Sequence, residues 1–131
     1  MRKFILIFLL AFALVLPIST SFAIDVVLTG AQLTITYTEP IVNSDASPLV
    51  DLDKTTIFVE PVGGNLIIQD VPATALTGGG TISQTITVPV PDFAETNVNV
   101  WANASDITGN VSANTPVILK RIDRLPPGAP Q

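Results

Sequence analysis

The sequence has no cysteine and no histidine among its 131 residues, and these two absences exclude several kinds of protein. Without cysteine the chain can form no disulfide, no thiolate metal site, no thiol nucleophile and no lipid-modified cysteine. Without histidine it lacks the commonest general base and the imidazole metal ligand. A carboxylate pair such as Asp92 and Glu95 could in principle serve a glycosidase, but no pattern around them indicates a cleft. We therefore expect a protein that is not an enzyme and binds no cofactor.

Basic residues are scarce as well, with six Lys and Arg against 11 Asp and Glu. Arg2 and Lys3 belong to an N-terminal segment that we expect to be removed. Residues 24–131 then carry four basic and 11 acidic residues, a net charge of −7. An acidic surface of this kind repels phosphate backbones and offers no basic patch. We therefore expect no nucleic-acid partner.

One long apolar run is present, and it lies at the N-terminus. The two basic residues precede an uninterrupted apolar segment, 4–16, which ends before Pro17. Ser21-Phe22-Ala23 has the small-x-small form that signal peptidase cleaves. The run is shorter than the roughly 20 residues of a membrane-spanning helix. We predict a cleavable signal peptide, 1–23, and an exported protein that is periplasmic, on the cell surface or secreted. It would meet the membrane only during export, and an uncleaved anchor is the alternative.

Beyond this segment, helix signals are nearly absent. The chain is rich in Val, Ile and Thr and is interrupted every 8–15 residues by Gly, Pro, Asn or Asp. Short alternating runs at this spacing are typical of an all-β sandwich or barrel. We predict one domain, 24–122, followed by a Pro-rich linker or tail, 123–131. The predicted strands are 26–29, 32–38, 55–59, 66–71, 81–88, 96–105 and 115–122.

Two stretches carry a resemblance to a known family. Residues 33–40 alternate apolar and polar positions up to a proline, and a polar loop follows at 43–52. Residues 102–112 lead from alternating apolar positions into an Asp-x-x-Gly-Asn-x-Ser turn. Both stretches resemble the fibronectin type III domain of exported microbial proteins. The resemblance implies an immunoglobulin-like, two-sheet antiparallel sandwich of about seven strands. Tyr37 stands where that family usually has tryptophan, and Val98 stands where it usually has tyrosine.

Trp101 is the leading candidate for contact with a ligand. If the alternate Val and Ala positions of strand 96–105 point inward, Trp101 points outward together with Asn99 and Asn103. An exposed aromatic ring could stack on a sugar ring while the amides bond to its hydroxyl groups. The alternatives are a tryptophan partly covered by a neighbouring strand, a tryptophan in the core if the register of the strand differs, or an interface of another kind.

Two polar segments have simpler interpretations. Asn43, Asp45, Asp51 and Asp53 form an acidic loop whose oxygens could hold calcium. Their spacing fits no defined calcium loop, and Asp is a common turn residue, so we assign no metal site. The segment 106–110 is interpreted as a structural turn for the same reason.

These observations predict an exported, non-catalytic binding or spacer module. Its ligand would be a protein or a carbohydrate, held by loops 40–54 and 71–80 or by the sheet face around Trp101. One alternative is a structural subunit of a larger surface assembly, joined to its neighbours through edge strands. Another is an accessory domain of a secreted glycan-active enzyme.

Overall fold

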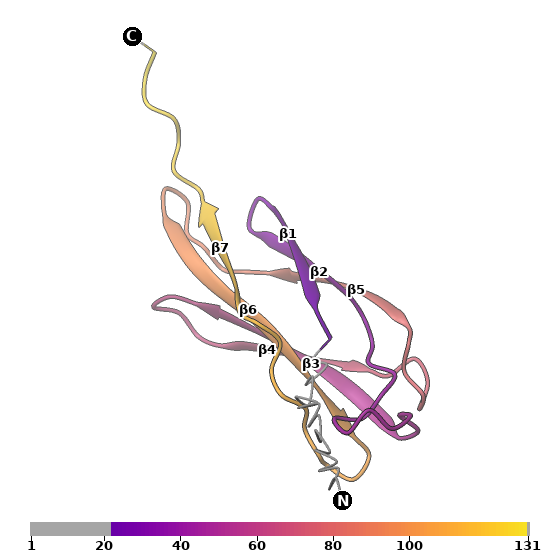
Figure 1. The fold of residues 1–131 in the computed structure, drawn as a ribbon. Coiled ribbons are helices and arrows are strands. Elements are labelled where there is room, and N and C mark those ends of the chain that lie inside the picture. Colours follow the sequence, from indigo (N-terminus) through magenta and orange to yellow (C-terminus); the bar gives the residue numbers. More distant parts are fainter. Residues whose placement is uncertain (1–21, 131) are drawn as a thin grey trace, which may run out of the picture.

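A computed structural model describes residues 22–130, and most of the predicted signal peptide, 1–21, lies outside this part of the chain. Residues 22–130 contain seven strands and no helix, so no helix of this part could cross a membrane. The prediction of an all-β chain is confirmed (Figure 1). The strands are β1 (Ile24–Thr29), β2 (Gln32–Thr38), β3 (Leu52–Pro61), β4 (Ile67–Pro72), β5 (Thr81–Thr87), β6 (Glu95–Asp106) and β7 (Ile118–Asp123).

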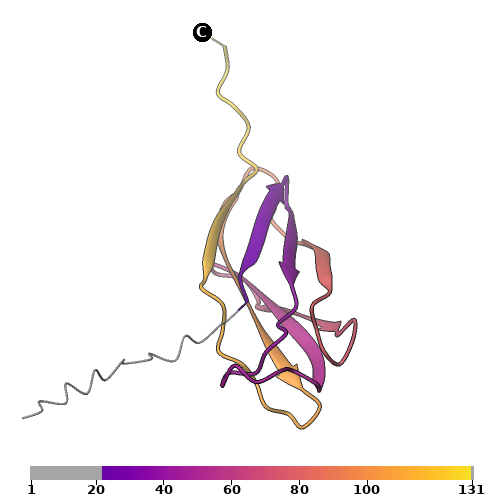
Figure 2. The ribbon, with the colours of Figure 1, turned by 45° about the vertical axis from the view of Figure 1, so that its right-hand side comes forward.

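The strands form two antiparallel sheets that pack as a β-sandwich. One sheet has the order β1-β2-β5, and the other has the order β4-β3-β6-β7. Each strand pairs antiparallel with its neighbours (Figures 1 and 2). The long strands β3 and β6 are the two central strands of the larger sheet, and β2 is the central strand of the smaller one.

Alternating residues of both sheets fill the space between them. Because successive side chains of a strand point to opposite faces, alternate residues of β1, β2, β5 and β6 point into this space. Burying one such Val, Ile or Leu side chain stabilises the domain by about 1.5–3 kcal/mol. The fully buried centre of this core is formed by Leu33, Ile35, Ile57, Val59, Val98, Val100, Ala102 and Ile122.

Tyr37 also belongs to this core. It stands at the position where fibronectin type III domains, which the sequence resembles, usually have tryptophan. Its hydroxyl group is hydrogen-bonded to that of buried Thr55. Burial raises the pKa of the Tyr37 phenol, while the bond to Thr55 acts in the opposite direction. The phenol is therefore neutral at physiological pH and ties β2 to β3 across the sandwich.

The structure confirms the bounds of the second predicted strand and corrects others. Strand β3 is longer than 55–59 because β6 pairs along its whole length, with a register shift between Leu52 and Lys54. The predicted start of the last strand at 115 is wrong, since β7 begins at Ile118. Pro116 has no amide hydrogen to continue the ladder. Thr115 instead donates its N–H to the carbonyl of Ala102, while its hydroxyl accepts the N–H of Ala102.

The loop between β4 and β5 is held in place by a buried carboxylate. Glu39, only 2% exposed, accepts hydrogen bonds from the Thr74 N–H (2.9 Å), the Thr74 hydroxyl (2.6 Å) and the Gly80 N–H (3.0 Å). Gly78 lies so close that an added Cβ would be 1.9 Å from the carbonyl oxygen of Pro40. The loop therefore packs directly on the end of β2.

Candidate functional site

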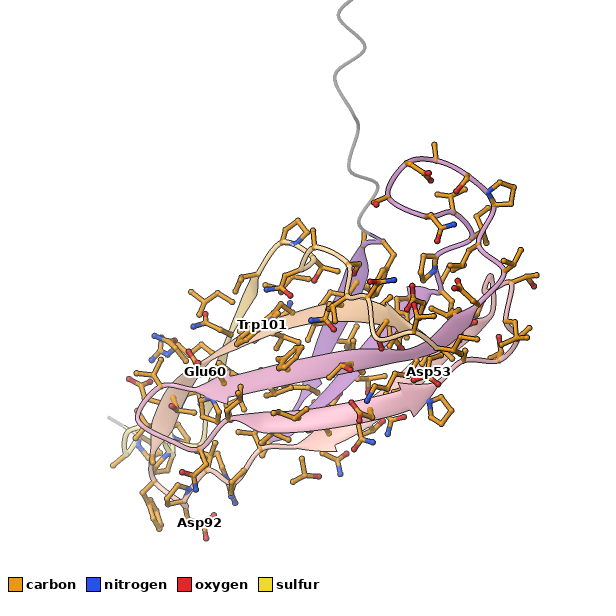
Figure 3. All side chains as sticks on the ribbon, turned by 90° about the horizontal axis from the view of Figure 1, so that it is seen from below. Asp53, Glu60, Asp92 and Trp101 are labelled. Atoms are coloured by element: carbon orange, nitrogen blue, oxygen red, sulfur yellow. The ribbon has the colours of Figure 1, made fainter. Side chains whose placement is uncertain are left out.

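The outer face of the larger sheet contains a stacked aromatic pair. Trp101 of β6 lies opposite Phe58 of β3, with ring centroids 5.3 Å apart and ring planes inclined by 7°. Val100 and Ala102, the residues before and after Trp101, are buried, so β6 has the predicted alternation. Figure 3, with β6, β3 and β4 in front, marks Trp101 on this face and Glu60 on the adjacent strand. Trp101 and Phe58 are both half-buried, since each covers part of the other.

Exposed aliphatic side chains extend this pair across the sheet. Ile68 of β4 lies opposite Phe58 and is 58% exposed. Leu119 of β7 lies opposite Asn99, which is two residues from Trp101 on β6, and is 62% exposed. We call Ile68, Phe58, Trp101 and Leu119 the outer stripe. Apolar side chains gathered on neighbouring strands of one sheet face mark a contact site more often than scattered single residues do.

The two predicted amide neighbours of Trp101 share its face but differ in their bonding. Asn99 and Asn103 occupy alternate positions on either side of Trp101 in β6. The Asn103 amide nitrogen donates to the Asn114 side-chain oxygen at 3.2 Å. Within residues 22–130, no protein group forms a hydrogen bond with the Asn99 side chain. Asn99 therefore has its amide free for a ligand, whereas Asn103 is partly engaged in the structure.

Ion pairs flank the outer stripe. Lys54 of β3 bonds to Asp70 of β4 at 2.9 Å on one side, and Arg121 of β7 pairs with Glu95 of β6 on the other. The hydrogen bond with Asp70 raises the pKa of Lys54, and the same bond lowers the pKa of the Asp70 carboxyl. These pairs neutralise their own charges. Glu60, opposite Asn99, has no ion-pair partner within residues 22–130.

A second concave region lies at one end of the sandwich, where the sequence predicts only loop 40–54 and the turn 106–110. A cavity of about 440 Å³ separates loop 40–49 from the turn after β6. Its apolar wall includes Leu49, Leu52 and Ala104, which form a small core cluster of their own. Phe22 also lines the cavity and packs against Tyr37 at 5.4 Å. Because the cavity joins segments about 60 residues apart, no local signal could have revealed it.

The polar segments of the loops have structural roles. Asp45 accepts hydrogen bonds from the N–H and hydroxyl of Ser47, which lower the pKa of its carboxyl. The described residues contain no cluster of three or more acidic side chains that could hold a metal ion. Asp106 accepts bonds from Thr108 and Asn110, and these bonds, those of the Asn110 side chain foremost, lower the pKa of its carboxyl to about 2.

The carboxylates of Asp92 and Glu95 are engaged separately. Asp92 pairs with Arg124, whose guanidinium also donates to the carbonyl of Val90 at 2.7 Å. Glu95 pairs with Arg121. Each carboxylate therefore has its own arginine, an arrangement suited to fixing loop 88–94 against the end of β7.

Comparison with protein-family models, with curated proteins and with solved structures finds no match for this chain.

Proposed function

We propose that this chain is an exported, non-catalytic binding module that recognises another protein through its outer stripe. The observation that carries the proposal is the stacked Trp101–Phe58 pair, continued by exposed Ile68 and Leu119 across all four strands of one sheet. Aromatic side chains flanked by polar groups are the usual centre of protein interfaces. The rigid sheet beneath them would hold this surface in a fixed geometry.

The arrangement of the rings favours a protein over a sugar as the ligand. A sugar ring stacks on an open aromatic face, but one face of Trp101 is covered by Phe58. The most exposed members of the stripe are aliphatic, and these suit the apolar side chains of a protein partner. A glycan is the second candidate ligand, supported by the free amide of Asn99 beside Trp101.

The proposed fibronectin type III type of the sandwich rests on the resemblance in the sequence. The place of the fourth strand supports this type over the constant-type immunoglobulin domain. In constant-type immunoglobulin domains, the fourth strand joins the sheet of the first, second and fifth strands. Here β4 pairs with β3 instead. We therefore favour a fibronectin type III-like sandwich. A spacer subunit of a surface assembly, or an accessory domain of a glycan-active enzyme, would use the same sandwich without needing the outer stripe.

Site-specific photo-crosslinking would test recognition through the stripe. A photoreactive residue in place of Leu119 should crosslink to one defined extracellular protein of the source organism. The same residue in place of Thr34, on the outer face of the other sheet, is the matched control and should not. Adding Trp101→Ala should reduce crosslinking from position 119 by at least tenfold, because the centre of an interface dominates its affinity.

Trp101 is the only tryptophan, so its fluorescence reports directly on this face. A fluorescence change on addition of the purified partner would support the proposal. Equal crosslinking from positions 119 and 34 would refute it. Binding on a glycan array that disappears in both Trp101→Ala and Asn99→Ala, without a protein partner, would favour the second candidate.

A further inference from the structure

Each sheet has two edge strands, whose outward backbone groups could pair with another chain. The edges are β1 and β5 in the smaller sheet and β4 and β7 in the larger one. Natural edges are blunted by charged side chains, by proline or by bulges. Strand β4 contains Asp70 and Pro72, and β7 contains Lys120, Arg121 and Asp123. These two edges are therefore protected, and β1 has a charge at Asp25.

Strand β5 has none of these protections. Its sequence, Thr-Ile-Ser-Gln-Thr-Ile-Thr, contains no charged residue and no proline, and its register with β2 is regular from Thr81 to Thr87. Figure 2 shows β5 at the border of the molecule, on the opposite side of β2 from β1. The strand is thus a regular seven-residue edge, open to another strand.

Two backbone hydrogen bonds at the ends of β5 establish which of its backbone groups face outward. The Glu39 N–H donates to the Gly80 carbonyl, and the Val88 N–H donates to the Ala31 carbonyl, each at 2.9 Å. Because bonding alternates along an antiparallel pair, the even-numbered residues of β5 bond to β2. The N–H and C=O groups of the odd-numbered residues point to the open edge. These residues are Thr81, Ser83, Thr85 and Thr87, all with exposed side chains.

The sequence of β5 is nearly a palindrome about Gln84. In an antiparallel pair of two β5 strands centred there, Thr81 lies opposite Thr87 of the other copy, and Ser83 lies opposite Thr85. The outward-facing odd residues meet one another, giving about eight backbone hydrogen bonds from four pairs that each exchange two. On the inner face, Ile82 of one copy meets Ile86 of the other. Cross-strand pairs of β-branched and of hydroxyl side chains stabilise a sheet.

We propose that two copies of this chain associate through β5, antiparallel about Gln84, and join their smaller sheets into one six-stranded sheet. A two-fold axis through Gln84 makes the contact self-complementary and closed, as in most homodimers. The acidic chain would repel its copy elsewhere, but β5 brings no charge to the contact. The outer stripe lies on the other sheet, so the proposal is independent of the proposed function.

Sedimentation velocity of the chain, purified from the exported fraction of a bacterial host, tests the association from about 1 μM to about 1 mM. We expect a concentration-dependent shift from monomer to dimer. Ser83→Lys and Thr85→Glu should each raise the dimer dissociation constant at least tenfold, because each places two like charges near the axis. Mixing the two variants should restore a heterodimer, because Lys at 83 then faces Glu at 85 of the other copy. Thr29→Lys, an exposed residue of β1, is the matched control and should dimerise like the unaltered chain.

A second variant tests the register by a different chemistry. Because the chain has no cysteine, Gln84→Cys introduces one thiol per copy. Directly opposed residues of a non-hydrogen-bonded pair have Cα atoms about 4.5 Å apart, within the range that a disulfide bridges. We expect mild oxidation to give a covalent dimer with Gln84→Cys and at least tenfold less with Thr29→Cys. A monomer at every concentration, an unchanged dimer in both charge variants, or no recovery in the mixture would overturn the proposal.

Discussion

Glu39 is a residue whose role depends on partners far away in the sequence. Its carboxylate is buried at the end of β2 and accepts three hydrogen bonds from the loop before β5. In the sequence it is simply the residue that precedes Pro40 at the end of a strand. Charged side chains are rarely this buried unless their oxygens are satisfied, as they are here.

Replacing this carboxylate should therefore destabilise the domain. Glu39→Ala leaves two backbone N–H groups and one hydroxyl without an acceptor, and we expect it to lower the free energy of unfolding by about 2–4 kcal/mol. Glu39→Gln keeps one acceptor oxygen and should lose about half as much. Urea unfolding followed by Trp101 fluorescence measures both values. Glu60→Ala, at an exposed position of β3, is the control and should change stability by less than about 0.5 kcal/mol. Equal losses at positions 39 and 60 would contradict the assigned role.

Asp106 gives the domain a defined response to acid. Bonds from Asn110 and Thr108 lower the pKa of its carboxyl to about 2, below the value of about 3.9 for an unfolded chain. Its contribution to stability is therefore complete above about pH 4 and is lost as the pH falls through about 2. We expect Asp106→Asn to be less stable than the unaltered chain at pH 7. The difference in melting temperature should shrink steadily between pH 4 and pH 2, and a difference that does not change with pH would refute this assignment.

At the scale of single elements, alternation predicted the faces of the strands better than their ends. Residues 32–38 alternate strictly, and β2 has these same bounds. The start of β7 was mispredicted because Thr115, before Pro116, bonds to β6 partly through its side chain. The length of β3 depends on β6, which the sequence of β3 does not contain. Periodicity reports the environment of a side chain, whereas the ends of a strand depend on its partner.

The loop between β4 and β5 depends on glycine for a reason of packing as well as conformation. Gly78 and Gly30 have similar positive φ angles, 66° and 60°. An added Cβ at Gly30 meets nothing within 4 Å, whereas at Gly78 it overlaps the carbonyl of Pro40. We expect Gly30→Ala to lower the free energy of unfolding by about 1 kcal/mol from the φ angle alone. Gly78→Ala should lower it by about 3 kcal/mol or more, because the loop must also move. Equal losses in thermal or urea unfolding would show that the close approach to Pro40 has no energetic consequence.

At the scale of the whole molecule, the predicted export signal and the core meet at Phe22. Its ring packs against Tyr37 and lines the cavity next to Leu49. If signal peptidase cleaves after Ala23, as predicted, Phe22 leaves and the cavity widens at that wall. The first strand would be unaffected, because β1 starts at Ile24.

Mass spectrometry of the chain recovered from the exported fraction tests this cleavage. We expect a product that begins at Ile24, together with loss of export when Arg2, Lys3 and the apolar run are deleted. Ala23→Asp should slow cleavage, since signal peptidase requires a small residue there. An exported product that retains Phe22 would contradict the predicted site, and Phe22 would then be a permanent part of the core.

The sequence by itself determined the all-β class and the faces of the strands. Both follow from local alternation and from the spacing of turn residues, which can be read along the chain. It also placed Trp101 on the same strand face as Asn99 and Asn103. Only the tertiary structure decided that Phe58 covers one face of Trp101, that Ile68 and Leu119 extend the pair, and that β5 is an open edge. Each of these depends on which strands become neighbours, and that pairing is decided by burial across the sandwich, between residues far apart in the sequence.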